Sequence, residues 1–150
     1  MWQNRTIMTI NRSGQSDVYT HLIACKESFI PPLDSYVDIK DYSYKLFNYS
    51  TRIEVYIEDT LAGLAALYIN KDRQSAYVTN FSVIPEYQRQ GIAGRLLEMS
   101  KEYVVANKLT FLDLDVFLVN HRAVSFYKRH GFIEVEKDDI KLKARWLKEE

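Results

Sequence analysis

The chain has 150 residues, 47% of them hydrophobic and 27% charged, and its twenty basic side chains balance its twenty acidic ones. This length suits one domain, residues 1–150, which buries roughly two thirds of the surface of the unfolded chain. A net charge of zero gives no overall field that would attract nucleic acid or an anionic membrane.

Neither a membrane span nor a metal centre is indicated by the sequence. No apolar run reaches about 18 residues, and residues 1–5 do not begin a signal peptide, so we expect a cytoplasmic protein without a membrane partner. The single cysteine, Cys25, excludes an internal disulfide and a cysteine-rich metal site. The three histidines lack metal-ligand spacing: His21, His121 and His130.

The N-terminal third predicts a short edge strand followed by two helices. Residues 6–10 can form the strand, and Ser16 is the expected N-cap of the first helix, whose apolar positions include Val18, Leu22 and Cys25. Two consecutive prolines require a loop at 30–34. The second helix is expected from 39 to 48, with three side chains on one side: Tyr42, Leu46 and Tyr49.

The remaining chain alternates between strands and helices. Three strands, 52–57, 61–69 and 76–84, form a meander. A helix begins at Gly91 and is followed by a strand over 111–118; because the connection is long enough for a crossover helix, the strands 76–84 and 111–118 should be parallel. A short helix then begins at Asn120 or His121 and ends at Gly131, and two last strands form a hairpin: 132–135 and 140–146.

The turn before the helix at Gly91 has the chemistry of an anion site. The first N–H groups of a helix have no partner within it, and the helix dipole favours negative charge there. Gly91 lets a ligand approach the backbone, Ala93 adds only a methyl group, and Arg89 adds a positive charge. On this spacing alone, phosphate binding and simple helix packing are equally good explanations. The spacing fits neither a P-loop nor a dinucleotide-binding turn.

A wider pattern around this turn resembles a known family. Gln88-Arg89-Gln90-Gly91-Ile92-Ala93 is similar to the coenzyme A-binding motif of the GCN5-related N-acetyltransferases (GNAT). A second part of the family pattern lies downstream, at Asn120-x-x-Ala123-x-x-Phe126-Tyr127-x-x-x-Gly131-Phe132. Both parts occur in the family's order and at its usual separation, across roughly the C-terminal half of the chain.

The resemblance implies a fold and a co-substrate. The fold would be α/β, with a mixed, mostly antiparallel central sheet, helices on both faces and a splayed parallel strand pair that binds acetyl-CoA. Backbone groups of Phe81, Ser82 and Val83 would hold the pantetheine arm, and Asn120 would contact the cofactor. The pyrophosphate would lie on the loop and the first helical turn: Arg89, Gln90, Gly91, Ile92, Ala93 and Gly94.

Acetyl transfer also needs a proton donor for the thiolate and a group that removes the proton from the amine. The family's general acid corresponds to Tyr127, which shares one helical face with Asn120; an aromatic packed on the sheet is the structural alternative. Asp113 and Asp115 are unusual on a strand buried on both sides. Some family members place a glutamate at the position of Asp115, so we name Asp115 as candidate base; Tyr77 could assist through a water relay. The other reading is that both aspartates bind neighbouring loops.

The acceptor is expected to be a small-molecule primary amine: an amino sugar, an amino acid or a polyamine. In the family the region 33–44 shapes the acceptor pocket, and we name Tyr36 and Tyr77 as acceptor contacts. Two alternatives are a catalytically silent coenzyme A-binding sensor or scaffold, and an acetyltransferase acting on protein N-termini or lysines. The chain is expected to be a monomer or a homodimer, with no metal.

Overall fold

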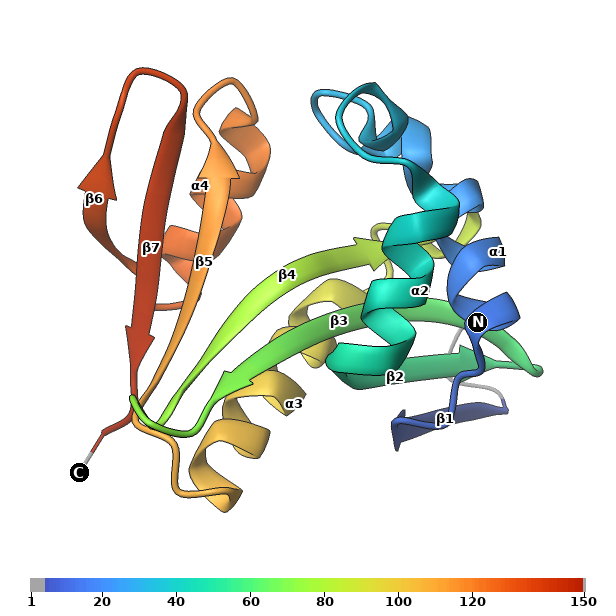
Figure 1. The fold of residues 1–150 in the computed structure, drawn as a ribbon, viewed down its shortest axis with the longest axis horizontal. Coiled ribbons are helices and arrows are strands. Elements are labelled where there is room, and N and C mark those ends of the chain that lie inside the picture. Colours follow the sequence, from blue (N-terminus) through green and yellow to red (C-terminus); the bar gives the residue numbers. More distant parts are fainter. Residues whose placement is uncertain (1–4, 150) are drawn as a thin grey trace.

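A computed structural model describes residues 5–149, which form one seven-stranded sheet flanked by helices (Figure 1). The strand order is β1-β2-β3-β4-β5-β7-β6. Three single-turn 3₁₀ helices lie at Lys26–Ser28, Leu33–Ser35 and Pro85–Tyr87. The other elements are β1 (Thr6–Ile10), α1 (Gln15–Cys25), α2 (Ile39–Tyr49), β2 (Thr51–Ile57), β3 (Thr60–Asn70), β4 (Ser75–Val83), α3 (Ile92–Ala106), β5 (Phe111–Phe117), α4 (His121–Arg129), β6 (Ile133–Lys137) and β7 (Lys141–Leu147).

The predicted fold class is confirmed. Neighbouring strands are antiparallel except β4 and β5, which are parallel and connected through α3. The segment 6–10 is the edge strand β1, and Gly131 follows α4 with a φ of 90°. The order of strands and helices therefore follows the order that hydrophobic periodicity and turn residues predict.

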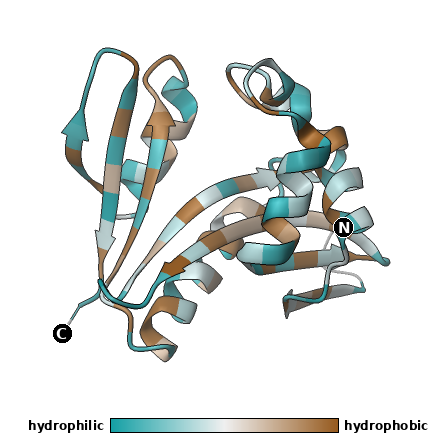
Figure 2. Cartoon of the chain, in the orientation of Figure 1, coloured by the Kyte–Doolittle hydropathy of each residue, from teal (hydrophilic) through white to brown (hydrophobic). Residues whose placement is uncertain are grey.

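The helices divide the core between the two faces of the sheet. On one face, α1 and α2 cover a cluster that includes Leu22, Leu46 and Leu64. On the other, α3 covers a larger cluster that includes Leu96 and Leu112. Apolar residues of β3, β4 and α3 are buried in this larger cluster, whereas β6 is exposed along its whole length and largely hydrophilic (Figure 2). Among the described residues, no helix is both long enough and apolar enough to cross a bilayer.

Two details of the early helices differ from the prediction. The N-cap of α1 is Gly14, not Ser16, and the Asp17 carboxylate accepts a hydrogen bond from the Gly14 N–H at 3.0 Å. Asp17 at the third helical position thus satisfies the N–H of the N-cap residue, and the helix begins at Gln15, before Ser16. Tyr49 lies at the last position of α2 and is 70% exposed, so it is not part of the packed side.

Strand β2 carries charged residues in a fully buried environment. The Glu54 carboxylate is 0% exposed and accepts hydrogen bonds from Thr9 Oγ1, Arg12 N and Ser13 N at 2.7, 2.8 and 2.9 Å. Arg52 Nε donates to Ser13 Oγ at 2.7 Å and lies 3.7 Å from Glu54 Oε2. Burial of such a pair is tolerated because every polar group has a partner. The pair holds the connection between β1 and α1 on the sheet.

The sheet opens between β4 and β5. Their parallel pairing extends only from Ser75–Phe111 to Val78–Leu114. Directly after Val78, β4 carries a bulge, because Leu67 of β3 pairs with Val78 but Ala66 pairs with Asn80, leaving Thr79 without an opposite residue. Beyond this point the two strands diverge (Figure 1). The C-terminal half of β4 therefore pairs with β3 alone.

Candidate active site

The opening between β4 and β5 continues as a cleft of about 730 Å³, bounded by the turn before α3, by α4 and by the loop that precedes α2. Most residues predicted from the sequence to bind cofactor or acceptor line it. They are Tyr36, Phe81, Ser82, Val83, Arg89, Gly91, Ala93, Gly94, Asp115, Asn120 and Tyr127.

Hydrogen bonds from α1 and α2 hold β4 in this open position. The Tyr42 hydroxyl, on α2, donates to the bulge carbonyl Thr79 O at 2.7 Å. On α1, His21 Nδ1 lies 2.8 Å from Leu61 O and Nε2 lies 2.8 Å from Ser82 Oγ. Burial lowers the pKa of His21 to about 4, so the imidazole is neutral at pH 7 and its Nδ1–H donates to the carbonyl.

The turn before α3 has an anion-binding backbone conformation. Arg89 has a φ of 63° and Gly91, the N-cap, a φ of 91°. Left-handed residues next to helical ones turn successive N–H groups toward one point, which makes a concave site for an anion. Gly91 has no side chain that could cap the helix, so the first-turn amides remain available.

The packing around position 94 does not require a glycine. A Cβ built there would meet only His130 Cε1, at 3.8 Å, which is an ordinary contact. At Gly63, by contrast, a Cβ would lie 2.9 Å from side-chain atoms of both Ile92 and Leu96. The space beside Gly94 opens into the cleft, as expected for a position where a ligand approaches the backbone.

Positive charge gathers at one end of the cleft. Arg89, Arg122 and Arg129 line it, whereas Asp115 is the one carboxylate among the described lining residues. Arg122 and Arg129 are seven positions apart in the sequence, so they share one side of α4. The sequence analysis did not identify Arg129, although this spacing could have revealed it. The arrangement suits a ligand with several phosphate charges.

Two residues predicted for the turn have side chains directed elsewhere. Gln90 Nε2 donates to Glu86 O at 3.3 Å, and the Ile92 side chain, 1% exposed, belongs to the hydrophobic core. Neither residue lines the cleft. Their backbone groups alone are placed where they could contact an anion.

Tyr127 projects from α4 into the cleft within an aromatic cluster. Its ring centroid lies 6.0 Å from that of Phe81, 5.4 Å from Phe126 and 5.6 Å from Phe132. Burial raises the pKa of the Tyr127 phenol, so the hydroxyl is protonated at every working pH. Asn120 Oδ1 accepts from Ala123 N at 3.2 Å and therefore caps α4 while it lines the cleft.

Tyr77 and Asp115 form a hydrogen bond from β4 to β5, with the Tyr77 hydroxyl donating to Asp115 Oδ2 at 2.8 Å. Burial, followed by the hydrogen bond to Asp115, raises the pKa of Tyr77. Asp113 accepts two hydrogen bonds from Arg145 of β7, at 2.7 and 2.9 Å. The expectation that both aspartates bind loops is wrong, because their partners are side chains of the neighbouring strands.

The two sides of the cleft meet at an aromatic contact. Tyr36, in the loop before α2, lies edge-on to Phe117 at the end of β5, with 5.7 Å between ring centroids. Asp38, an acidic residue of the same region, accepts from Asp41 N at 3.0 Å and caps α2. Tyr36 is thus the residue of this segment that lines the cleft, while Asp38 stabilises the fold.

Side chains that could ligate a metal are dispersed over the described part of the chain. Within residues 5–149, no three His, Cys, Asp or Glu side chains come together in a group that could hold a metal ion.

Comparisons with known proteins agree with this geometry. A family model described as "Acetyltransferase (GNAT) family" matches residues 16–132. The ribosomal-protein-S18-alanine N-acetyltransferase of Escherichia coli superposes with a TM-score of 0.72 at 20% identity, over 94% of each chain. The PaiA N-acetyltransferase of Thermoplasma acidophilum, solved with coenzyme A, gives 0.76 at 19% identity over 95% of this chain and 99% of its own. A GNAT acetyltransferase of Elizabethkingia anophelis, solved with acetyl-CoA, gives 0.75 at 13% identity over 97% and 99%.

Proposed function

Because this chain belongs to the GNAT family of acetyltransferases, we propose that it transfers the acetyl group of acetyl-CoA to a primary amine of a small molecule in one ternary complex. Acetyl-CoA is the co-substrate of the family, and structural neighbours have been solved with coenzyme A and with acetyl-CoA. The identity of the acceptor and the roles of individual residues are our proposals.

The observation that carries the proposal is the divergence of β4 and β5 directly beside the anion-binding turn. Phe81 to Val83 pair with β3 on one side only, so the backbone groups on their other side face the cleft and can bind the amides of a pantetheine arm. The turn from Arg89 to Gly94 lies at the end of the same cleft, where its amides and nearby arginines can hold the pyrophosphate. The free space at Gly94 fits a ligand at that point.

When bound, acetyl-CoA supplies an activated thioester carbonyl. Tyr127 is the proposed proton donor to the departing thiolate, because its hydroxyl is protonated and its ring is held by the aromatic cluster. Asn120 contacts the cofactor from the start of α4.

Asp115 is the proposed site for the amine. An alkylammonium has a pKa about six units above that of a carboxylic acid, so direct proton transfer to Asp115 is uphill by about 8 kcal/mol. Asp115 Oδ2 already accepts a hydrogen bond from Tyr77, and the carboxylate keeps further lone pairs for an ammonium group. Asp115 therefore binds the ammonium, and the proton leaves through Tyr77-bound water to solvent before the attack.

The contact between Tyr36 and Phe117 favours a small acceptor over a protein segment. The two rings join opposite sides of the cleft. An extended polypeptide would have to separate them, whereas a compact amine can lie beneath them, next to Tyr77 and Asp115.

The test combines cofactor binding with acetyl transfer. Gly94→Leu should weaken coenzyme A binding at least tenfold by calorimetry. The matched control is Gly14→Leu, at a glycine far from the cleft where a Cβ also finds space, 3.9 Å from Asp17 Oδ2. Equal affinities in these two variants would overturn the cofactor assignment. Thiol release with amino sugars, amino acids and polyamines should exceed release with peptides. Binding without transfer to any amine would support a silent binding module instead.

A further inference from the structure

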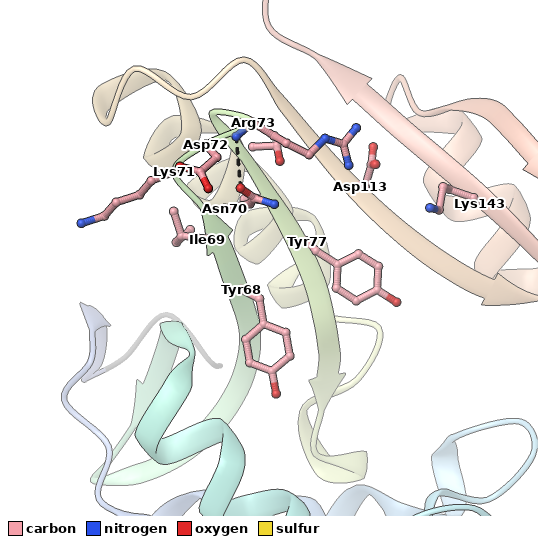
Figure 3. A pocket seen from close by; sticks show the side chains of 11 residues that line it. Tyr68, Ile69, Asn70, Lys71, Asp72, Arg73, Tyr77, Asp113 and Lys143 are labelled. Carbon is pink, nitrogen blue, oxygen red and sulfur yellow. Dashed lines mark hydrogen bonds between the residues drawn. The ribbon is translucent and has the colours of Figure 1, made fainter.

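A second cavity, of about 560 Å³, lies on the same face of the sheet as Asp115, next to the cleft but outside it. The turn between β3 and β4 forms one side of it, and β5 and β7 form the other (Figure 3). Tyr77 connects the two sites: it lines this cavity, and its hydroxyl donates a hydrogen bond to Asp115, which lines the cleft. A molecule that reaches from one site to the other would lie along Tyr77.

Strand register places Lys143 beside the proposed amine site. Lys143 of β7 is the direct pairing partner of Asp115 on β5. Directly opposite residues of antiparallel strands lie on the same face, about 5 Å apart. The Lys143 side chain lines the second cavity, and Figure 3 shows the Tyr77 ring between Tyr68 and Lys143.

The cavity carries positive charge that its own carboxylates do not neutralise. Lys71, Arg73 and Lys143 line it together with Asp72 and Asp113. Asp113 is already matched by Arg145 through two hydrogen bonds. Asp72 therefore remains within the cavity, and Asp115, opposite Lys143 on β5, is the other carboxylate nearby, so three cations face two carboxylates. Among residues 5–149, neither Arg73 nor Lys143 forms an ion pair.

Two guanidinium groups share one aromatic ring beside this cavity, and of the two only Arg73 lines the cavity itself. Arg73 and Arg145 both lie over the ring of Phe111, at 5.3 and 4.0 Å from its centroid. The ring stabilises each cation, but the two positive charges repel one another. Only Arg145 has a carboxylate partner. A ligand that carries negative charge would relieve this repulsion.

We propose that the second cavity binds the anionic group of the acceptor, a carboxylate or a phosphate, while the acceptor's amine lies at Asp115. The assignment rests on the proposed acetyl transfer and narrows the acceptor to amines that also carry an acid. Lys143 and Arg73 hold the anion, and the Tyr77 ring supports the chain between the two groups. Hydrogen bonds between ionised partners are roughly twice as strong as neutral ones. We therefore expect the acidic group of the acceptor to contribute most to the difference in affinity between small amines.

Binding of two matched ligand pairs tests this assignment without dependence on turnover. The pairs are 6-aminohexanoate with its neutral amide, and glucosamine 6-phosphate with glucosamine. In the protein with coenzyme A bound, NMR titration should shift the amide signals of Tyr77 and Lys143, and at least one anionic member should bind about tenfold or more tightly than its neutral partner. The pair that shows the preference identifies the acid as a carboxylate or a phosphate.

Variants then locate the anion. Lys143→Gln and Arg73→Gln should each reduce the preference for the anionic member about tenfold. Lys137→Gln, at an exposed position of β6 outside both cavities, should leave it unchanged. Three results would each overturn the proposal. They are equal binding of both members of each pair, the absence of a shift at Tyr77 and Lys143, and a preference for the anionic member that survives both substitutions. Thiol release is measured separately: transfer to neutral amines as fast as to anionic ones refutes this inference alone, whereas no transfer to any amine refutes the proposed function.

Discussion

The hydroxyl of Tyr42 donates a hydrogen bond of 2.7 Å to the carbonyl of Thr79, the residue of β4 that has no opposite partner on β3. A bulge leaves backbone groups outside the ladder, and a buried carbonyl without a partner is costly. Tyr42 satisfies that carbonyl from α2. The opening of the sheet thus depends on a helix packed over it as well as on the strands.

Replacement of this hydroxyl should affect both stability and cofactor binding. Tyr42→Phe removes one hydrogen bond, so the free energy of unfolding in urea should fall by about 0.5–1.5 kcal/mol. Acetyl-CoA affinity by calorimetry should fall several-fold, because the bulge is less firmly held. Tyr44→Phe, on the same helix but 51% exposed, is the control and should change neither quantity. A stability loss with unchanged affinity would show that the bulge keeps its position without Tyr42.

Removal of a single oxygen atom tests whether Tyr127 is the proton donor. Tyr127→Phe keeps the ring within its aromatic cluster and should lower kcat by about 10²–10⁴-fold, the range typical of general acid catalysis. Acetyl-CoA affinity should change little. Tyr103→Phe, at another tyrosine packed against the core, is the matched control. Near-normal turnover of Tyr127→Phe would mean that Tyr127 is only a core aromatic and that another group donates the proton.

Stability should decrease in mild acid because of His21. Its folded pKa of about 4 lies below the unfolded value of 6.5, so the unfolded chain binds the proton first as the pH falls. The stability present above pH 6.5 is therefore lost progressively down to about pH 4. From pH 7.5 to 5, the wild type should lose about 2 kcal/mol more than His21→Gln in urea unfolding. His121→Gln, at an exposed site, should retain the full wild-type dependence, and identical curves for wild type and His21→Gln would contradict this assignment.

The buried pair on β2 should be sensitive to loss of one charge. Glu54→Gln leaves Arg52, 4% exposed, without its counter-charge, and breaking such a pair typically costs about 3–5 kcal/mol. The melting temperature should fall accordingly. Glu58→Gln removes an exposed carboxylate 3.9 Å from Arg5 and should cost less than about 1 kcal/mol. Similar losses for the two variants would mean that Arg52 finds other partners.

Local chemistry was sufficient to predict the elements that build the site. Gly91 before a helix, Asn120 or His121 at a helix start and Gly131 at a helix end each act within a few residues, and the structure has each where the sequence indicates. The family motif added the cofactor-binding and acid residues, and nearly all of them line one cleft.

Pairings between distant strands and helices could not be predicted in this way. The contacts of Tyr77 with Asp115, Asp113 with Arg145 and Tyr42 with Thr79 span 38, 32 and 37 positions. They depend on register and on which helix covers which strand, and a single sequence contains no local signal for either. The burial of Arg52 and Glu54 has no local signal either, because charges that alternate with apolar residues along a strand normally face solvent.

The short parallel pairing of β4 with β5 has a mechanical consequence. It comprises four residue pairs, from Ser75–Phe111 to Val78–Leu114, and is the only strand pairing in the described sheet that links β1–β4 to β5–β7. A small rotation about so short a joint moves the far ends of the two halves much more than the joint itself. Ala76 and Leu112 face each other within it and line no part of the cleft. The width of the cleft therefore depends on a strand pairing that includes residues outside the cleft.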